Sequence, residues 1–248
     1  MNSYLVGERR LSVAGGTDVG RRYPANFDVM HVDGDRPVVA VADGMGAGRG
    51  SALAGRTAVD GFVAAARAAG ARPEAGALRA AVADVQRQVN RAGADLGELT
   101  GCTLTALVGC EPDAAWIVHV GDSRAYRWRD GLLEQLTVDH TMAWLGAVNG
   151  WYPFDSPQAA RDRYHLTRYV GHPAMPEPDL LHVSLRPGDV LCLCTDGIAE
   201  QVPYRRLAEV LGTGRSPADM VGHLITDAAA AGGSDNATAV VIAVAGDR

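Results

Sequence analysis

Residues 38–44 read Val-Val-Ala-Val-Ala-Asp-Gly, a short apolar run that stops at an aspartate and a glycine. An apolar run of this length, bounded by turn residues, predicts a buried strand. Residues 190–197, Val-Leu-Cys-Leu-Cys-Thr-Asp-Gly, repeat this form. In residues 119–124 an Asp-Ser follows an apolar run, and in residues 232–240 an Asp-Asn precedes one. Four aspartates are therefore expected at strand ends: Asp43, Asp122, Asp196 and Asp235.

Similar runs outline the first two thirds of the fold. Strands are expected before and after a helical region, at residues 10–14, 27–32, 37–42, 102–110, 115–120, 124–128 and 132–136. The helical period covers residues 51–69 and 74–92 and predicts an antiparallel helix pair that covers a sheet. Asp130-Gly131 is a hairpin signal, and tight turns between strands indicate antiparallel pairing.

The last third begins with a long connection, residues 139–179, that has no clear period and contains several aromatic residues. Because long irregular connections are uncommon in compact domains, we interpret it as a flap or lid. Further strands are expected at residues 181–185, 189–194 and 236–245, and helices at 204–211 and 217–230. No repeat or linker divides the chain, so residues 1–248 are predicted to form one α+β domain.

Composition argues against several classes of protein. The 248 residues have a formal net charge of -6, and their 23 Lys and Arg residues are scattered, so no nucleic-acid partner is expected. No segment resembles a signal peptide or is apolar over enough residues to span a bilayer, so we expect no membrane contact and a cytoplasmic location. The four cysteines lack metal-ligand spacing and are expected to be reduced core thiols.

The four aspartates indicate chemistry only as a set. A single aspartate at a strand end is usually a turn residue that caps backbone N–H groups. Strand ends of one sandwich can meet at one edge, however, where carboxylates repel one another unless a cation lies between them. Oxygen ligands suit Mg²⁺ or Mn²⁺, and the absence of paired His or Cys argues against zinc. Gly44 has no side chain and would let a backbone oxygen approach such an ion.

The motifs around these aspartates resemble those of a known family. In order along the chain they are VADGMGAGRGSALA, GCTLTALVG, HVGDSRAYRWRDGLLEQLTVDHT, LTRYVG, LCLCTDGIAEQV and GGSDNATAVVI. The series is similar to that of the metal-dependent PP2C-type (PPM) serine/threonine phosphatases, particularly the compact bacterial ones, and extends over residues 20–244. The resemblance implies an α-β-β-α sandwich, in which two antiparallel sheets are flanked by antiparallel helix pairs.

The resemblance also implies a metal-binding and catalytic set. Asp43 would bridge two Mn²⁺ or Mg²⁺ ions, and the Gly44 carbonyl would ligate one of them. Asp196 and Asp235 would complete the shell of the first ion. Asp122 resembles the family's ligand of a weaker third ion. The residues expected to be essential for catalysis are therefore Asp43, Asp196 and Asp235.

Other residues are implied to support this set. Asn236 and Asp28 are expected behind the ligands, Arg22 is expected at the phosphate, and residues 139–168 resemble the family's flap. The implied reaction is hydrolysis of phosphoserine and phosphothreonine in proteins, by attack of a water that bridges the two ions. The expected partners are phosphorylated proteins and a Ser/Thr kinase or its targets, and a monomer is expected.

A proton must reach the leaving alkoxide, and its source is open. Eukaryotic members of the family have a histidine two residues after the Asp-Gly aspartate, where this chain has Met45. His119 and His140 are the other candidates, although a histidine in or beside a strand is usually structural.

One motif departs from the family. The usual pattern is Arg, two residues and then Asn-Glu-Asp, in which Glu ligates the second ion and Arg binds the phosphate. Residues 21–28 read Arg-Arg-Tyr-Pro-Ala-Asn-Phe-Asp. Phe27 therefore stands where the ligating Glu is expected, and Tyr23 stands where the Arg is expected, one residue from Arg22. A phenyl ring cannot ligate Mg²⁺.

Three interpretations follow from this departure. In the first, Asp28 or water replaces the missing carboxylate, and the enzyme works with a weakened second metal site. In the second, the second ion is lost and the chain is a catalytically impaired regulatory or binding module. In the third, the substrate is a small phosphorylated metabolite, an idea motivated by aromatic residues in the flap: Trp144, Trp151, Tyr152 and Phe154. The four retained aspartates favour activity.

Overall fold

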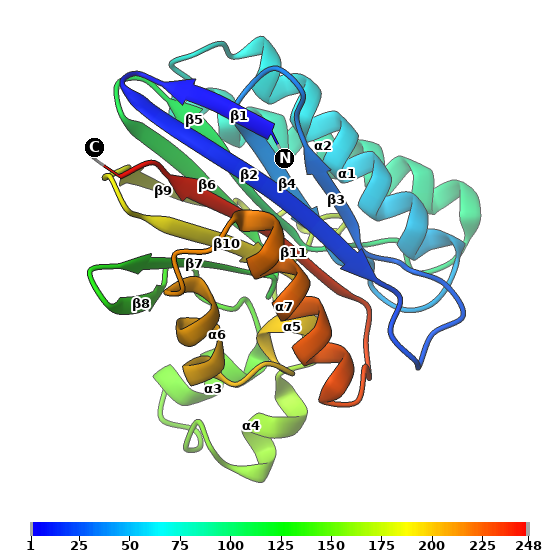
Figure 1. Ribbon diagram of the computed structural model, residues 1–248. Coiled ribbons are helices and arrows are strands. Elements are labelled where there is room, and N and C mark those ends of the chain that lie inside the picture. Colours follow the sequence, from blue (N-terminus) through cyan, green and yellow to red (C-terminus); the bar gives the residue numbers. More distant parts are fainter. Residues whose placement is uncertain (1, 247–248) are drawn as a thin grey trace.

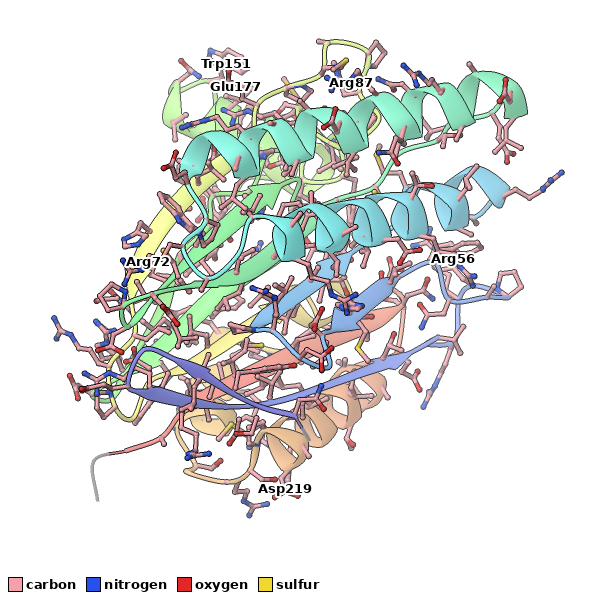
Figure 2. All side chains as sticks on the ribbon, turned by 90° about the horizontal axis from the view of Figure 1, so that it is seen from above. Arg56, Arg72, Arg87, Trp151, Glu177 and Asp219 are labelled. Atoms are coloured by element: carbon pink, nitrogen blue, oxygen red, sulfur yellow. The ribbon has the colours of Figure 1, made fainter. Side chains whose placement is uncertain are left out.

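Two antiparallel sheets lie face to face at the centre of the computed structural model, which describes residues 2–246. The six-stranded sheet has the order β1-β2-β11-β10-β7-β8, and the five-stranded sheet has the order β3-β4-β5-β6-β9. Figure 2 shows α1 and α2 (cyan) on one side of the sheets and α7 (orange) on the other, so the chain forms four layers. The strands are β1 Asn2–Val6, β2 Arg9–Asp18, β3 Val29–Val32, β4 Val38–Ala42, β5 Leu104–Cys110, β6 Ala114–Val120, β7 Arg124–Arg129, β8 Leu132–Gln135, β9 Asp179–Ser184, β10 Val190–Cys194 and β11 Ala237–Val244.

The five-stranded sheet is covered by α1 (Arg49–Ala68) and α2 (Ala75–Leu96), which lie side by side in Figure 1. Small residues on α1 let the helix approach the sheet closely. A Cβ at Gly55 would stand 2.9 Å from the Val29 side chain, and Ala54 and Ala58 are fully buried. Phe62 is the largest buried side chain of α1 and belongs to the core cluster shared with the sheet and α2.

The six-stranded sheet is covered by α5 (Asp196–Ala199), α6 (Tyr204–Leu211) and α7 (Pro217–Ala230). The α7 helix begins after Ser216, whose Oγ accepts a hydrogen bond of 3.2 Å from the Asp219 N–H. It packs tightly on β2, because a Cβ at Gly16 would stand 2.7 Å from the Val221 side chain. This close contact holds α7 against the sheet, and the turn at residues 235–236 follows α7 in the chain.

The sheets bury apolar residues on both faces, and this explains the continuous apolar runs in the sequence. All five residues of β4 and all five of β10 are buried. One face of each strand contacts the opposite sheet, as Val41 and Leu193 do, and the other face contacts helices. A strand covered on both faces has no polar alternation.

The expected α+β architecture, two antiparallel sheets flanked by helices, is confirmed, but several details differ. The first strand, β1, was not expected, and the strand predicted at 27–32 begins at Val29. Residues 139–179 are not wholly irregular, because they contain α3 (Met142–Val148) and α4 (Pro157–Asp162). Each helix is too short to produce a clear period. Each is instead defined by its cap: Thr141 Oγ1 accepts from the Trp144 N–H and Ser156 Oγ from the Ala159 N–H.

No helix within residues 2–246 combines the length and the apolar character that crossing a membrane would require.

Candidate functional site

The structure brings the four strand-end aspartates together around one cavity of about 200 Å³. Asp43 follows β4, Asp122 lies in the turn between β6 and β7, Asp196 is the first residue of α5, and Asp235 precedes β11. Four separate turns from both sheets therefore meet at one edge of the sandwich. Gly44 also lines this catalytic pocket, as we call the cavity from here on.

Burial raises the pKa of all four carboxyl groups, and repulsion from neighbouring carboxylates adds to the rise for Asp43, Asp122 and Asp196. Burial is the largest cause for each of them, and the charge of Asp196 is the second cause for both Asp43 and Asp122, whose pKa values lie well above the usual range. The pKa of Asp196 rises to about 6, with Asp235 as its main charged neighbour. Among the described residues Asp196 Oδ1 has no hydrogen-bond partner. Such a cluster is stabilised by a cation.

Thr103 joins two of the turns, a role that sequence reasoning missed. Its Oγ1 accepts a hydrogen bond of 2.8 Å from the Asp43 N–H and shares one of 2.6 Å with Ser123 Oγ, next to Asp122. The Thr103 N–H donates to the Asp43 carbonyl at 2.9 Å. A Cβ at Gly121 would stand 2.6 Å from the Thr103 side chain, so this turn lies directly against it. These contacts fix Asp43 relative to Asp122.

Asn236 holds the N-terminal loop against the start of β11. Its Oδ1 accepts a hydrogen bond of 2.7 Å from the Phe27 N–H, and its Nδ2 donates to the carbonyls of Val19 and Ala25 at 2.7 and 3.2 Å. The side chain is buried. Asn236 thus positions the loop that carries Arg22, and it also lines the catalytic pocket.

Asp28 is a fifth carboxyl group of this region, but it does not line the pocket. It is 8% exposed, and its Oδ2 accepts a hydrogen bond of 2.8 Å from Thr195 Oγ1. Its Oδ1 has no partner among the described residues. Burial raises the pKa of Asp28 to about 7, although hydrogen bonds from Thr195 and Thr238 act against the rise.

Aromatic rings occupy the side of the pocket near Phe27. The Phe27 ring is 8% exposed and packs edge to face on Tyr23, with centroids 6.2 Å apart. Tyr23 lines the catalytic pocket, and the Arg22 guanidinium lies 5.0 Å from the centroid of its ring. Arg22 also lines an adjoining hollow of about 360 Å³ together with Asp196 and Asp235. The guanidinium is therefore placed beside the carboxylates.

The donor set fits a hard divalent cation. Among residues 2–246, no three His, Cys, Asp or Glu side chains converge closely enough to hold an ion by themselves. Mg²⁺ and Mn²⁺ accept backbone oxygens and waters beside one or two carboxylates, so a looser set of aspartates suits them. At Gly44 a Cβ would stand 2.7 Å from the Ser51 carbonyl, so the backbone there is closely packed.

The two histidines considered as proton donors lie outside the pocket lining. His140 Nδ1 accepts a hydrogen bond of 3.1 Å from the Gly121 N–H, and its Nε2 lies 3.0 Å from Asp179 Oδ2. His119 is buried between Thr105 Oγ1 and the Val138 carbonyl, and burial lowers its pKa to about 3. Both side chains support the strands and the turn before Asp122.

The flap, residues 139–168, contributes to the pocket in a way that the sequence did not predict. Tyr164 and Leu166 line the catalytic pocket, and Arg163 lines the adjoining hollow. Hydrogen bonds from the Met142 N–H to the His165 carbonyl and from the Thr167 N–H to the His140 carbonyl hold the two ends of the flap together. No periodic pattern marks these residues, so only the folded chain shows where they lie.

Comparisons with known proteins identify the family of the chain. Residues 26–226 match the family described as Protein phosphatase 2C. The chain is 29% identical over 236 residues to the serine/threonine phosphatase stp of Listeria monocytogenes, covering 91% of this chain and 93% of that protein. The chain therefore belongs to the protein phosphatase 2C family.

Solved structures support a narrower assignment. The PPM Ser-Thr phosphatase MsPP from Mycobacterium smegmatis has a TM-score of 0.82 at 34% identity, covering 94% of this chain and 97% of that one. The catalytic domain of the phosphatase PstP, in complex with 2 manganese ions, has a TM-score of 0.81 at 29% identity, covering 95% and 98%. The chain is a metal-dependent protein serine/threonine phosphatase of the bacterial type, which confirms the predicted family, fold and activity.

Proposed function

We propose that residues 1–248 form a single phosphatase domain that hydrolyses phosphoserine and phosphothreonine in proteins, with Mn²⁺ or Mg²⁺ bound in the catalytic pocket. The observation that supports this most strongly is the meeting of Asp43, Asp122, Asp196 and Asp235 at one cavity. The relatives that the chain resembles are serine/threonine phosphatases, and PstP was crystallised with manganese.

Each pocket residue has a proposed role. Asp43, Asp196 and Asp235 hold the ions, with the Gly44 carbonyl as a further ligand, and Asp122 serves a third, weaker ion. Bound divalent ions supply positive charge for the phosphoryl oxygens and make water a better nucleophile. Arg22 binds the phosphate, because its guanidinium lies beside the pocket and lowers the pKa of Asp235 by its charge, against the larger effect of burial.

The protein itself is not the nucleophile in this proposal. All four cysteines are free and buried. Burial raises the pKa of Cys102, the cysteine nearest in sequence to Thr103, above its ordinary value, so its thiol stays protonated. In this proposal water is the attacking group, and the chain's side chains orient the substrate and stabilise charge.

Phe27 favours one second candidate, a module with impaired turnover. Its phenyl ring is buried against Tyr23 and offers no ligand to a second ion. Asp28, the next residue, has an Oδ1 without a partner in residues 2–246 and is the nearest carboxyl in sequence that can compensate. We infer that the second metal site is weakened and that turnover remains. A monomeric state, a cytoplasmic location and a partner Ser/Thr kinase stay predictions of the sequence.

Turnover of p-nitrophenyl phosphate with Mn²⁺, with EDTA and in Asp43→Ala tests the proposal. We expect turnover that requires Mn²⁺ and is lost in Asp43→Ala. Asp60→Ala is the matched control, because Asp60 is exposed on α1 and should leave turnover unchanged. Turnover in EDTA, or an unchanged rate in Asp43→Ala, would contradict the proposal. Faster turnover of phosphorylated metabolites than of phosphopeptides would instead favour a small-molecule substrate.

A further inference from the structure

A hollow beneath the flap adjoins the catalytic region. This flap pocket has a volume of about 210 Å³, and its lining includes Trp144 and Phe154 from the flap and Glu200 from the end of α5. It shares Arg163 and Glu200 with the adjoining hollow of about 360 Å³. That hollow shares two aspartates and Tyr164 with the catalytic pocket. The three cavities therefore adjoin one another between the proposed metal ligands and the flap, and we call them together the trough.

The flap is a packed unit rather than a loose loop. Figure 1 places α3 and α4 together at the lower end of the molecule. The Tyr152 hydroxyl lies 2.9 Å from the Met142 carbonyl and 2.7 Å from Asp162 Oδ2, which joins the two helices. Its ring fills the space beside Gly146, where a Cβ would stand 2.1 Å from Tyr152 Cζ. The flap can therefore hold its outer side chains in fixed positions.

Two aromatic side chains of this unit remain exposed at the trough. Trp144 is 38% exposed and Phe154 is 63% exposed, and both line the flap pocket. A single exposed apolar residue is common, but a patch of exposed aromatic surface that lines a cavity indicates a binding site. The walls of the flap pocket are thus suited to an apolar group or to the face of a cation.

The charged side chains that line the flap pocket differ in how many hydrogen bonds and ion pairs they make. Arg124 is fully engaged: its guanidinium pairs with both oxygens of Asp139 and also donates to Tyr126 Oη and the Ala199 carbonyl. Glu200 accepts no hydrogen bond from any residue in the described part of the chain. Its only ion pair there is with Arg163, at 3.6 Å.

Glu200 is also poorly hydrated. Its side chain is only 23% exposed, so water reaches little of the carboxylate. A half-buried carboxylate with a single ion pair is stabilised by a further positively charged hydrogen-bond donor. The flap pocket therefore combines aromatic walls with an acceptor that is not fully used.

We propose that the flap pocket binds the side chain of an arginine or lysine close to the phosphorylated residue of the protein substrate. The methylene stem would lie on Trp144 and Phe154, and the charged head would reach Glu200. An apolar side chain would leave Glu200 with Arg163 as its single ion-pair partner in the described part of the chain, and an acidic one would be repelled by Glu200. The inference rests on the proposed phosphatase function and names its substrate class, phosphoproteins with a basic residue beside the phosphorylated site.

Phosphopeptides that differ at one position test the proposal. Arginine, leucine or glutamate is placed at each position on either side of the phosphothreonine, and kcat/KM is measured with Mn²⁺. At one position we expect arginine to exceed leucine by about tenfold, which corresponds to about 1.4 kcal/mol. Glu200→Gln and Trp144→Ala should each reduce that preference to about twofold or less, a loss of the size expected for one ion pair or cation–π contact. Turnover of p-nitrophenyl phosphate, which is too small to reach the flap pocket, should stay within about twofold of the wild type.

Matched controls are available outside the trough. Trp151 and Glu177, both labelled in Figure 2, are exposed and do not line the trough. Trp151→Ala and Glu177→Gln should therefore keep the full preference for arginine. Thermal melts of all four variants establish that each one folds.

Three results would overturn the proposal. Leucine equal to or better than arginine at every position would show that the pocket does not select a cation. An unchanged preference in both Glu200→Gln and Trp144→Ala would show that selection lies elsewhere. A loss of p-nitrophenyl phosphate turnover in Glu200→Gln as large as the loss on peptides would assign Glu200 to the metal centre. Failure of the wild type to hydrolyse p-nitrophenyl phosphate would instead contradict the phosphatase function itself.

Discussion

Replacing Phe27 by glutamate supplies the carboxylate that the family has at this position. The hydrogen bond from the Phe27 N–H to Asn236 Oδ1 uses only the backbone of residue 27 and should survive the change. The variant loses a buried phenyl ring, which costs about 2 kcal/mol, and its edge-to-face contact with Tyr23, which costs about 1 kcal/mol. It also adds a negative charge to a crowded carboxylate cluster. Without metal, Phe27→Glu should therefore be less stable by about 3 kcal/mol, or about 6–12 °C in Tm.

Mn²⁺ should reverse much of this loss. If glutamate at position 27 reaches the second ion, Mn²⁺ affinity at that site should rise by at least about tenfold, or about 1.4 kcal/mol. A ligand at 100 times its Kd stabilises the folded state by about 2.7 kcal/mol. The rise in Tm on adding Mn²⁺ should therefore be larger for Phe27→Glu than for the wild type. Calorimetric Mn²⁺ titration and thermal melts with and without Mn²⁺ measure both quantities, and p-nitrophenyl phosphate turnover should increase.

Phe27→Gln is the control for this experiment, because it removes the same ring and adds a side chain of the same size as glutamate without the charge. It should lose the stability of the buried ring as Phe27→Glu does, without the added charge repulsion, and should gain little Mn²⁺ affinity. Equal Mn²⁺ binding by Phe27→Glu, Phe27→Gln and the wild type would refute the reasoning. That result would mean that position 27 does not face a second ion and that the loop register differs from the family's.

Three further predictions concern other parts of the site. Asp43→Asn should lower Mn²⁺-dependent turnover by more than about 100-fold, because substitutions of residues that only support metal ligands already cost up to about 100-fold. It should also raise the metal-free Tm by relieving repulsion between carboxylates. An unchanged metal-free Tm would argue against repulsion within the cluster. The pKa of Asp28 is raised to about 7, so the folded chain keeps a proton that the unfolded chain releases, and the wild type loses stability from this group as the pH rises from about 4 to about 7. Relative to the wild type, Asp28→Asn should therefore become more stable across that pH range, by a few kcal/mol at most. Urea titrations with EDTA measure the free energy of unfolding of both proteins. A stability difference between them that does not change with pH would contradict this prediction. Gly197→Ala would place a Cβ 1.8 Å from the Asn236 carbonyl, because α5 lies directly against the residue before β11, and should cost about 3 kcal/mol in urea unfolding. Gly222→Ala in α7, with no atom within 4 Å, should be neutral or stabilising. Similar values for the two variants would contradict this close contact between α5 and Asn236.

The strands were predictable where a continuous apolar run shows that both faces of the strand are buried. The runs at β4 and β10 are entirely buried because each strand lies between the other sheet and a helix layer. The edge strand β1 was missed, because it is short and three of its five residues are at least partly exposed. The α3 and α4 helices were missed because each has at most seven residues and is set by a single capping side chain.

The site was predictable in its acidic residues but not in the contacts that position them. An aspartate at the end of an apolar run is visible in the sequence, and the four aspartates found in this way all line the catalytic pocket. The role of Thr103 depends on contacts with two turns that lie far apart in the chain. The same holds for Tyr164, which reaches the pocket only because the flap folds back over it. Such long-range contacts leave no periodic pattern in the sequence.

The central claim is that Asp43, Asp196 and Asp235 bind the ions that this phosphatase uses. Anomalous diffraction at the manganese edge from crystals soaked in Mn²⁺ tests it most directly. We expect one strong manganese peak beside Asp43, Asp196 and Asp235, with a weaker peak or none on the side of Phe27. Manganese peaks only at other places in a crystal of the active enzyme, with none beside Asp43, would contradict it.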